Sequence, residues 1–253
     1  MDELTLFRIL LWGWFGLAAG MAILLSVVTA PYGRHVRRGW GPTTGNRLGW
    51  LLMEAPAALV FGACFVLGEY RTGPTAWAFF LMWQVHYVHR AFVYPRTLHS
   101  ARTRMPLVIV GFGFVFNGLN GYLNGRWLYT FSGGYPDHWL VDPRFVLGLL
   151  LFVTGYAINR RADGTLRRLR QEVRDGYGIP YGGLYRWISC PNYFGEIVEW
   201  SGWALATWSL PGLAFAFWAA ANLAPRAQSH HRWYRERFAE YPPERKALVP
   251  GIW

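Results

Sequence analysis

Seven apolar segments constrain what this 253-residue chain can fold into. Their ranges are 5–30, 49–68, 74–94, 106–123, 144–160, 193–209 and 211–226. A helix that crosses a hydrocarbon core of about 30 Å needs roughly 20 predominantly apolar residues. Lipid offers no hydrogen-bond partners to the backbone, so segments of this kind become helices. The pattern predicts an all-α, polytopic membrane protein with seven transmembrane helices.

The last two segments are separated only by the short stretch WSLPG, which contains Pro211 and Gly212. Such residues end or interrupt a helix. A tight hairpin of two helices is the simplest interpretation, and one long kinked helix is the alternative.

The composition and the charge distribution agree with a membrane protein. Hydrophobic residues make up 53% and charged residues 15% of the chain, against roughly 25% charged residues in ordinary soluble domains. The net charge is +11, but the basic residues lie between apolar segments and form no nucleic-acid-binding motif. We therefore expect no nucleic-acid partner.

Twenty of the 25 basic residues fall in the connections after the first, third and fifth segments and in the C-terminal tail. In a seven-helix arrangement these four regions share one side, which the positive-inside rule makes cytoplasmic. The N-terminus is then predicted outside and the C-terminus in the cytoplasm. Arginine outnumbers lysine by 24 to 1, which fits a high-GC genome and hence a bacterial inner membrane.

Neither a metal site nor a disulfide is indicated. Cys64 lies in an apolar segment and Cys190 in a polar connection, so we interpret both as free thiols. His230 and His231 are adjacent and point in different directions, and no third ligand has suitable spacing.

Polar side chains inside the apolar segments are the candidates for function. Glu54 stands alone in WLLMEAPAALVFG, and a charged side chain at the bilayer centre costs roughly 2.5–3.5 kcal/mol on insertion scales. In the third segment Tyr87 and Arg90 share a helical face. Tyr87 favours a polar cavity, whereas Arg90 fits equally a helix end that reaches toward the head groups.

A second polar group is an asparagine stripe, Asn117, Asn120 and Asn124, in the fourth segment. Asparagines of this kind can contact a ligand or simply join membrane helices.

The second half of the chain has a pattern that suits a nucleotide. Asn159, Asp163, Arg167 and Arg170 fall on one helical face, where an acid can meet a ribose and arginine a phosphate. Asn192 and Glu196 open the sixth segment, although a helix start alone also favours an asparagine cap and early acids.

After the last segment, Arg226, His230 and Tyr234 form a polar stripe. No Rossmann fingerprint and no P-loop is present, so a nucleotide would bind in a pocket of helices and loops.

Three stretches carry a resemblance to a known family. HYVHRAFVYP, the run from YGIPYGGLYRWISCPNYFGEIVEW to QSHHRWY, and the closing YPPERKALVPGIW resemble the steroid 5α-reductase family. The resemblance is strongest from about residue 159 to the end. It implies a seven-helix membrane enzyme that uses NADPH to reduce the Δ4 double bond of a 3-oxo steroid.

The resemblance also implies residue roles. Glu54 and Tyr87 would be catalytic and would hold the 3-keto oxygen of the substrate. The residues implied in NADPH binding are Asn159, Asp163, Arg170, Tyr177, Asn192, Glu196, Arg226, His230 and Tyr234, with Tyr32, Arg34 and Arg90 in addition. Met53 would contact the substrate where the family commonly has glutamine, and methionine cannot donate an amide hydrogen bond.

We expect a single membrane domain in which residues 1–125 mainly serve the substrate and residues 144–253 mainly serve the cofactor. Three alternatives stay open at this point. They are an enone or enoyl reductase that acts on another lipid, an isoprenylcysteine-type methyltransferase that uses S-adenosylmethionine, and a non-catalytic lipid-binding protein.

Overall fold

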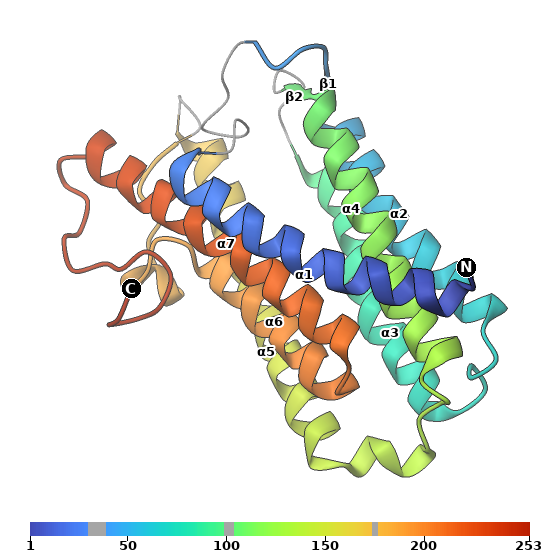
Figure 1. Ribbon diagram of the computed structural model, residues 1–253. Helices are drawn as coiled ribbons and strands as arrows, with labels where there is room; N and C mark the ends of the chain where they lie inside the picture. Colours follow the sequence, from blue (N-terminus) through green and yellow to red (C-terminus); the bar gives the residue numbers. More distant parts are fainter. Residues whose placement is uncertain (30–38, 99–103, 174–176) are drawn as a thin grey trace. The chain divides into compact units, whose positions relative to one another are not determined.

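Seven α-helices dominate the computed structural model, which describes residues 1–29, 39–98, 104–173 and 177–253. They are α1 (Glu3–Val27), α2 (Asn46–Leu67), α3 (Pro74–Val88), α4 (Leu107–Arg126), α5 (Pro143–Glu172), α6 (Pro191–Thr207) and α7 (Leu210–Arg237) (Figure 1). α3 and α6 each start with a proline, which suits the first helical position because its missing N–H would have no helical partner there.

Short non-α elements extend or link these helices. α3 continues into a π-helical turn, η2 (His89–Val93), and a 3₁₀ turn, η3 (Tyr94–Thr97). α4 continues into the π-helical turn η4 (Trp127–Phe131), and the 3₁₀ turns η5 (Asp137–Val141) and η6 (Gly183–Arg186) precede α5 and α6.

A two-stranded ribbon departs from the all-α expectation. β1 (Thr43–Gly45) precedes α2 and pairs antiparallel with β2 (Arg104–Pro106), which precedes α4. The Arg104 side chain reinforces the pair, because its Nε donates to Thr43 Oγ1 at 2.7 Å. The ribbon therefore fixes the starts of α2 and α4 next to each other.

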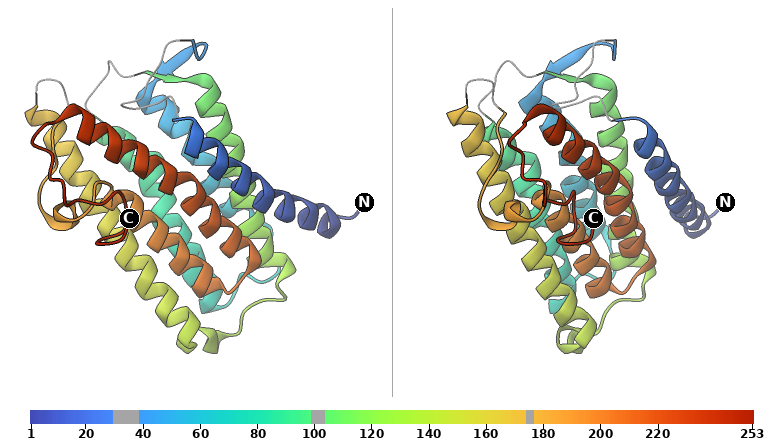
Figure 2. Two further views of the ribbon diagram at one scale, coloured as in Figure 1. Left: turned by 60° about the vertical axis from the view of Figure 1, so that its left-hand side comes forward. Right: turned by 90° about the vertical axis from the view of Figure 1, so that its left-hand side faces the viewer.

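The chain divides into two compact units, and the first comprises Met1–Leu11 and Pro31–Pro143. In this unit α2 packs along α4 and against α3, and both views agree on this arrangement (Figures 1 and 2). Aromatic rings fill the core: Phe61 of α2 stacks on Trp83 of α3 at 4.5 Å between ring centroids and meets Tyr129 edge-on at 5.4 Å. The Trp83 indole N–H donates to the carbonyl of Ala57 at 3.0 Å.

The second unit comprises Trp12–Ala30 and Arg144–Trp253. Here α5 and α6 approach so closely that their glycines touch the facing backbone. A Cβ added to Gly195 would lie 2.6 Å from the backbone nitrogen of Asn159, and one added to Gly155 or Gly202 would overlap the facing helix in the same way. Small residues at this spacing permit close packing of membrane helices.

α6 and α7 form a helical hairpin, which confirms the simplest interpretation of the WSLPG stretch. Trp208 ends α6 in the left-handed conformation with φ 43°. Ser209 then caps α7, because its hydroxyl oxygen accepts the Gly212 N–H at 3.1 Å. The interpretation of Cys64 and Cys190 as free thiols is confirmed as well.

Within the described residues, four helices are long and apolar enough to cross a membrane: Glu3–Val27, Asn46–Leu67, Leu107–Phe131 and Pro143–Glu172. Large apolar side chains stand exposed on them, among them Ile23 at 71%, Phe112 at 69% and Leu59 at 64%. Contiguous apolar surface of this kind fits lipid and not water. The chain is an integral membrane protein.

The other three predicted spans differ from these four in length or polarity. α3 has 15 residues and α6 has 17, so at 1.5 Å per residue each is shorter than an average hydrocarbon core. The third, α7, extends well beyond the predicted end at 226, since its polar second half remains helical. α5, which is one of the four, likewise extends beyond the predicted end at 160.

The close approach of α5 and α6 yields a prediction. Gly155→Ala should lower the free energy of unfolding by about 1–3 kcal/mol or more, because the new methyl group meets the backbone of Glu199. Gly164→Ala on the same helix is the matched control, since its Cβ would find only the Arg167 guanidinium, at 3.8 Å. Thermal unfolding in detergent should show a large loss for Gly155→Ala and none for Gly164→Ala. Equal melting temperatures would contradict the tight helix crossing.

Candidate active site

The first unit brings Glu54 and Tyr87 to the same face of α4. Asn117 Nδ2 donates to Glu54 Oε2 at 3.2 Å, and Asn120 Nδ2 donates to the Tyr87 hydroxyl at 3.4 Å. Because Asn117 and Asn120 are three residues apart, their side chains project one helical turn from each other on one face. Tyr87 is 3% exposed and the Glu54 side chain 12% exposed. A carboxyl and a phenol thus meet neighbouring asparagines of α4, and both side chains are largely buried.

Arg90 belongs to this same cluster. It lies in the π-helical turn η2, with its Nε 3.7 Å from Glu54 Oε1. Its guanidinium stacks over the rings of Trp50 at 4.5 Å and Tyr94 at 4.8 Å, positions at which a cation is stabilised by the ring electrons. Arg90 therefore lies beside the carboxyl in the first unit. Glu54, the lone charged residue of its apolar segment, thus has both a guanidinium and an amide as neighbours.

Met53 packs toward α4. A Cβ added to Gly113 would clash with the Met53 Cγ and Sδ atoms, so the thioether side chain occupies the notch that this glycine leaves. Gly113 lies one turn before Asn117 on α4, which puts Met53 and Glu54 against successive turns of that helix.

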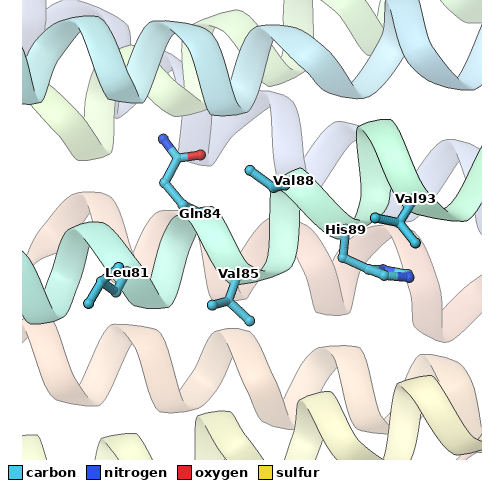
Figure 3. A pocket seen from close by; sticks show the side chains of 6 residues that line it. All are labelled: Leu81, Gln84, Val85, Val88, His89 and Val93. Atoms are coloured by element: carbon cyan, nitrogen blue, oxygen red, sulfur yellow. The ribbon is translucent and has the colours of Figure 1, made fainter.

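A shallow hollow of about 350 Å³ lies along α3 and η2 (Figure 3). Leu81, Gln84, Val85, Val88, His89 and Val93 line it. The hollow is open and mostly apolar, and neither Glu54 nor Tyr87 borders it. We therefore do not assign the candidate site to it.

The second unit gathers the polar residues expected to meet a nucleotide. Asn159 of α5 donates from Nδ2 to the backbone carbonyl of Asn192 at 3.0 Å and to Glu196 Oε2 at 3.3 Å. In return, Asn192 Nδ2 donates to Asp163 Oδ1 at 3.2 Å. Two amides and two carboxylates from α5 and α6 thus form one network. Asn159 and Asp163 are buried, and Asn192 and Glu196 are partly exposed.

Tyr193 joins this region to α7. Its hydroxyl lies 2.9 Å from His230 Nε2 and accepts a hydrogen bond from Arg226 at 3.1 Å. The sequence analysis did not single out Tyr193. Arg226 and His230 are spaced i, i+4, and this pair could have indicated a polar partner on the helix packed against α7.

Other predicted cofactor residues lie elsewhere. The ring of Tyr234 is buried and stacks on Tyr241 of the tail at 5.2 Å between ring centroids. Tyr177 meets Trp233 edge-on at 5.5 Å, and Arg170 is exposed on α5. Tyr32 and Arg34 lie outside the described residues.

The C-terminal tail folds back on the loop before α6. Ser189 Oγ lies 2.6 Å from His231 Nδ1 and 2.7 Å from the Tyr241 hydroxyl, and it donates to the carbonyl of Lys246 at 3.1 Å. Burial lowers the pKa of His231 below its usual 6.5, and the nearby positive charges of Arg235 and Lys246 act in the same direction.

The chain is similar to known proteins. The family model described as 3-oxo-5-alpha-steroid 4-dehydrogenase matches residues 103–253. The steroid 5-alpha-reductase DET2 of Arabidopsis thaliana is 41% identical over 238 residues, which cover 92% of this chain and 91% of that protein. The 3-oxo-5-alpha-steroid 4-dehydrogenase 1 of Bos taurus is 41% identical over 234 residues, 91% of this chain and 90% of that protein. Its Homo sapiens counterpart is 40% identical over 224 residues, 87% and 85% of the two chains.

This integral membrane protein is thus an oxidoreductase of the class that acts on CH–CH groups. The chain belongs to the steroid 5α-reductase family. This membership favours a reductase over the methyltransferase and the non-catalytic alternatives.

The half-buried His231 generates a prediction for the dependence of stability on pH. A histidine whose pKa is lower in the folded than in the unfolded chain binds protons more readily when unfolded. Its contribution to stability is therefore complete above about pH 6.5 and is lost as the pH falls through the lower pKa of the folded state. The melting temperature of the wild type should fall as the pH is lowered from 8 to 5.5, and the melting temperature of His231→Gln should fall less. His138→Gln, at an exposed position, should behave as the wild type. The same fall of the melting temperature with pH in all three proteins would contradict the assignment of this pH dependence to His231.

Proposed function

We propose that this protein reduces the Δ4 C=C bond of 3-oxo-Δ4 steroids to 5α-dihydro steroids with NADPH as the reductant. The observation that supports the proposal most directly is the placement of Glu54 of α2 and Tyr87 of α3 against one face of α4. The family model is named for 3-oxo steroids, and a carboxylic acid and a phenol can both donate hydrogen bonds to the carbonyl oxygen of such a substrate.

The two residues would act on the 3-oxo oxygen of the substrate. Reduction at C5 of a conjugated enone moves negative charge through C4 to that oxygen. Hydrogen-bond donors aimed at the oxygen in a water-excluded site stabilise this charge more than water does. Tyr87 donates through its hydroxyl, and Glu54 donates in its protonated form. Both side chains are largely buried, which limits the access of water to them.

The second unit fits a dinucleotide by its chemistry. Asp163 and Glu196 supply acceptors for ribose hydroxyls, and the amides of Asn159 and Asn192 supply donors and acceptors for a carboxamide or a base. Five arginines follow on α5: Arg160, Arg161, Arg167, Arg168 and Arg170. Guanidinium groups bind phosphate in a bidentate manner. NADPH has one more phosphate than NADH, so these arginines favour NADPH.

We assign Asn159, Asp163, Asn192, Glu196, Tyr193 and the pair Arg226 and His230 to cofactor binding, with Arg170, Tyr177, Tyr234, Tyr32, Arg34 and Arg90 as further candidates. When bound, NADPH supplies the hydride that adds to C5. The protein's part is to bind and orient the cofactor and to hold the proton on the Glu54 carboxyl.

The same proposal includes the membrane arrangement. Seven spans with the N-terminus outside would put the arginine-rich half of α5 and the tail in the cytoplasm, where NADPH is available. Residues 1–125 would then serve the substrate and residues 144–253 the cofactor. The apolar exposed faces of the helices suit a substrate that partitions into lipid, and a bacterial inner membrane fits the arginine-rich composition.

A second candidate is reduction of another membrane-soluble enone. Met53 favours it, because a thioether beside Glu54 offers apolar contact and no hydrogen bond to a steroid A-ring. A substrate series of 3-oxo-Δ4 steroids and non-steroid lipid enones separates the two candidates by turnover.

The roles of Glu54 and Tyr87 yield a prediction. Tyr87→Phe removes a donor, and Glu54→Gln replaces the acid O–H by a far less acidic amide N–H. Each should lower kcat by about 10²–10³-fold, the order of the cost of one lost donor at an oxyanion. The Kd for NADPH should stay unchanged, because neither residue contacts the cofactor in this proposal. Steady-state turnover of a 3-oxo-Δ4 steroid and NADPH titration in detergent measure both quantities.

Glu69→Gln and Tyr70→Phe are the matched controls, since both residues are exposed in the loop after α2. They should keep wild-type turnover. Wild-type kcat in Glu54→Gln would remove Glu54 from the mechanism.

A further inference from the structure

The hydrogen bonds of Asn117, in the asparagine stripe of α4, show how its amide group is oriented. Asn117 Nδ2 donates at 2.8 Å to the backbone carbonyl of Met53 and at 3.2 Å to Glu54 Oε2. An amide NH₂ has two protons, so both bonds form together. Because both partners are oxygens on α2, the nitrogen of the amide, and not its oxygen, must face that helix.

The contact comes at a weak point of α2. Pro56 lies inside this helix and has no N–H, so the carbonyl of Leu52 lacks its usual helical donor. The helical ladder is therefore interrupted in the turn that carries Met53 and Glu54. The amide of Asn117 ties the backbone of this turn and the carboxyl of Glu54 to α4, which limits the rotation of the carboxyl.

The bond also distinguishes the two oxygens of Glu54. Oε2 accepts an N–H of the amide, and the Nε of Arg90 lies 3.7 Å from Oε1. In the proposed function the acid proton of the neutral carboxyl is held on Oε1. The guanidinium of Arg90 lies over the rings of Trp50 and Tyr94.

Tyr87 also accepts a hydrogen bond from an asparagine of α4. Asn124 Nδ2 donates to Asn120 Oδ1 at 3.1 Å, which leaves Asn120 Nδ2 to donate to the Tyr87 hydroxyl oxygen at 3.4 Å. The phenol oxygen accepts from α4, so its own proton points away from Asn120. Hydrogen bonds arranged in a chain polarise one another and strengthen the last donor.

We propose that Asn117 and Asn120 are positioning residues for the reduction. Each donates an N–H to the oxygen of a catalytic acid, and so each directs the proton of that acid toward the 3-oxo oxygen of the substrate. This inference rests on the function proposed above for Glu54 and Tyr87. It assigns the stripe a role beyond joining α2, α3 and α4.

The test concentrates on Asn117, which contacts Glu54. Asn117→Leu keeps the approximate size of the side chain and removes its polarity. Asn117→Asp keeps the shape and removes both N–H donors. Each variant of the full chain in detergent should lower kcat for a 3-oxo-Δ4 steroid by about ten- to hundredfold, the order expected for a misplaced reacting group. The Kd for NADPH should not change.

Leu123→Ala is the control for a general loss of packing. Leu123 is 1% exposed on the same helix and makes no polar contact with its side chain. It should lower the melting temperature at least as much as Asn117→Asp while keeping kcat within a few fold of the wild type. If Leu123→Ala and Asn117→Asp lowered kcat in proportion to their loss of melting temperature, the positioning role would be refuted.

A double-mutant cycle separates positioning from an independent effect. Because Asn117 acts through Glu54, Asn117→Leu should cost little further activity in a Glu54→Gln background. Losses that multiply in the double variant, or wild-type kcat in both single variants at Asn117, would overturn the inference. Retained turnover in Glu54→Gln alone is a different result, because it refutes the proposed function itself.

Discussion

Polar groups inside apolar helices need partners within the protein, and this constraint organises both units. Lipid cannot hydrogen-bond to an amide or a carboxyl, so each such group must be satisfied by a neighbouring helix. In the first unit the amide of Asn117 donates to the carboxyl of Glu54 and to the backbone carbonyl of Met53. In the second unit the amides of Asn159 and Asn192 join α5 to α6. The bonds that hold the helices together are the bonds that shape the candidate sites.

The two polar networks have different chemistry, and this difference supports a division of labour. The first contains one carboxyl, one phenol and asparagines, with a single arginine stacked on aromatic rings. It suits a neutral oxygen that gains charge during a reaction. The second contains two carboxylates close to a basic helix and a basic tail. It suits a ligand with both sugar hydroxyls and phosphates.

Close backbone contact is the other requirement of the second network. Asn159 can reach the Asn192 carbonyl and Glu196 because Gly155 and Gly195 let α5 and α6 approach without intervening side chains. A larger residue at either glycine would separate the helices and with them the polar groups.

Much of this arrangement could be predicted from the sequence, because it depends on local periodicity. Apolar length located the helices, the WSLPG stretch located the α6–α7 hairpin, and the helical period brought Asn117, Asn120 and Asn124 onto one face. Contacts between segments distant in the chain could not be predicted in the same way. The ribbon of β1 and β2, the position of Tyr193 between His230 and Arg226, and the stacking of Tyr234 on Tyr241 all depend on tertiary packing. The resemblance to the family supplied the roles of Glu54 and Tyr87, and the hydrogen bonds of α4 supplied a reason for their placement.

The most direct measurement follows the hydride. NADPH carrying deuterium at C4 of the nicotinamide, prepared separately in each of the two stereochemical forms, is incubated with the purified protein and a 3-oxo-Δ4 steroid. The proposed reaction predicts that one of the two forms transfers a single deuterium to C5 and that the product has the 5α configuration, as mass spectrometry and NMR would show. A reduced steroid without deuterium from either form, or no reduction of the steroid at all, would contradict it.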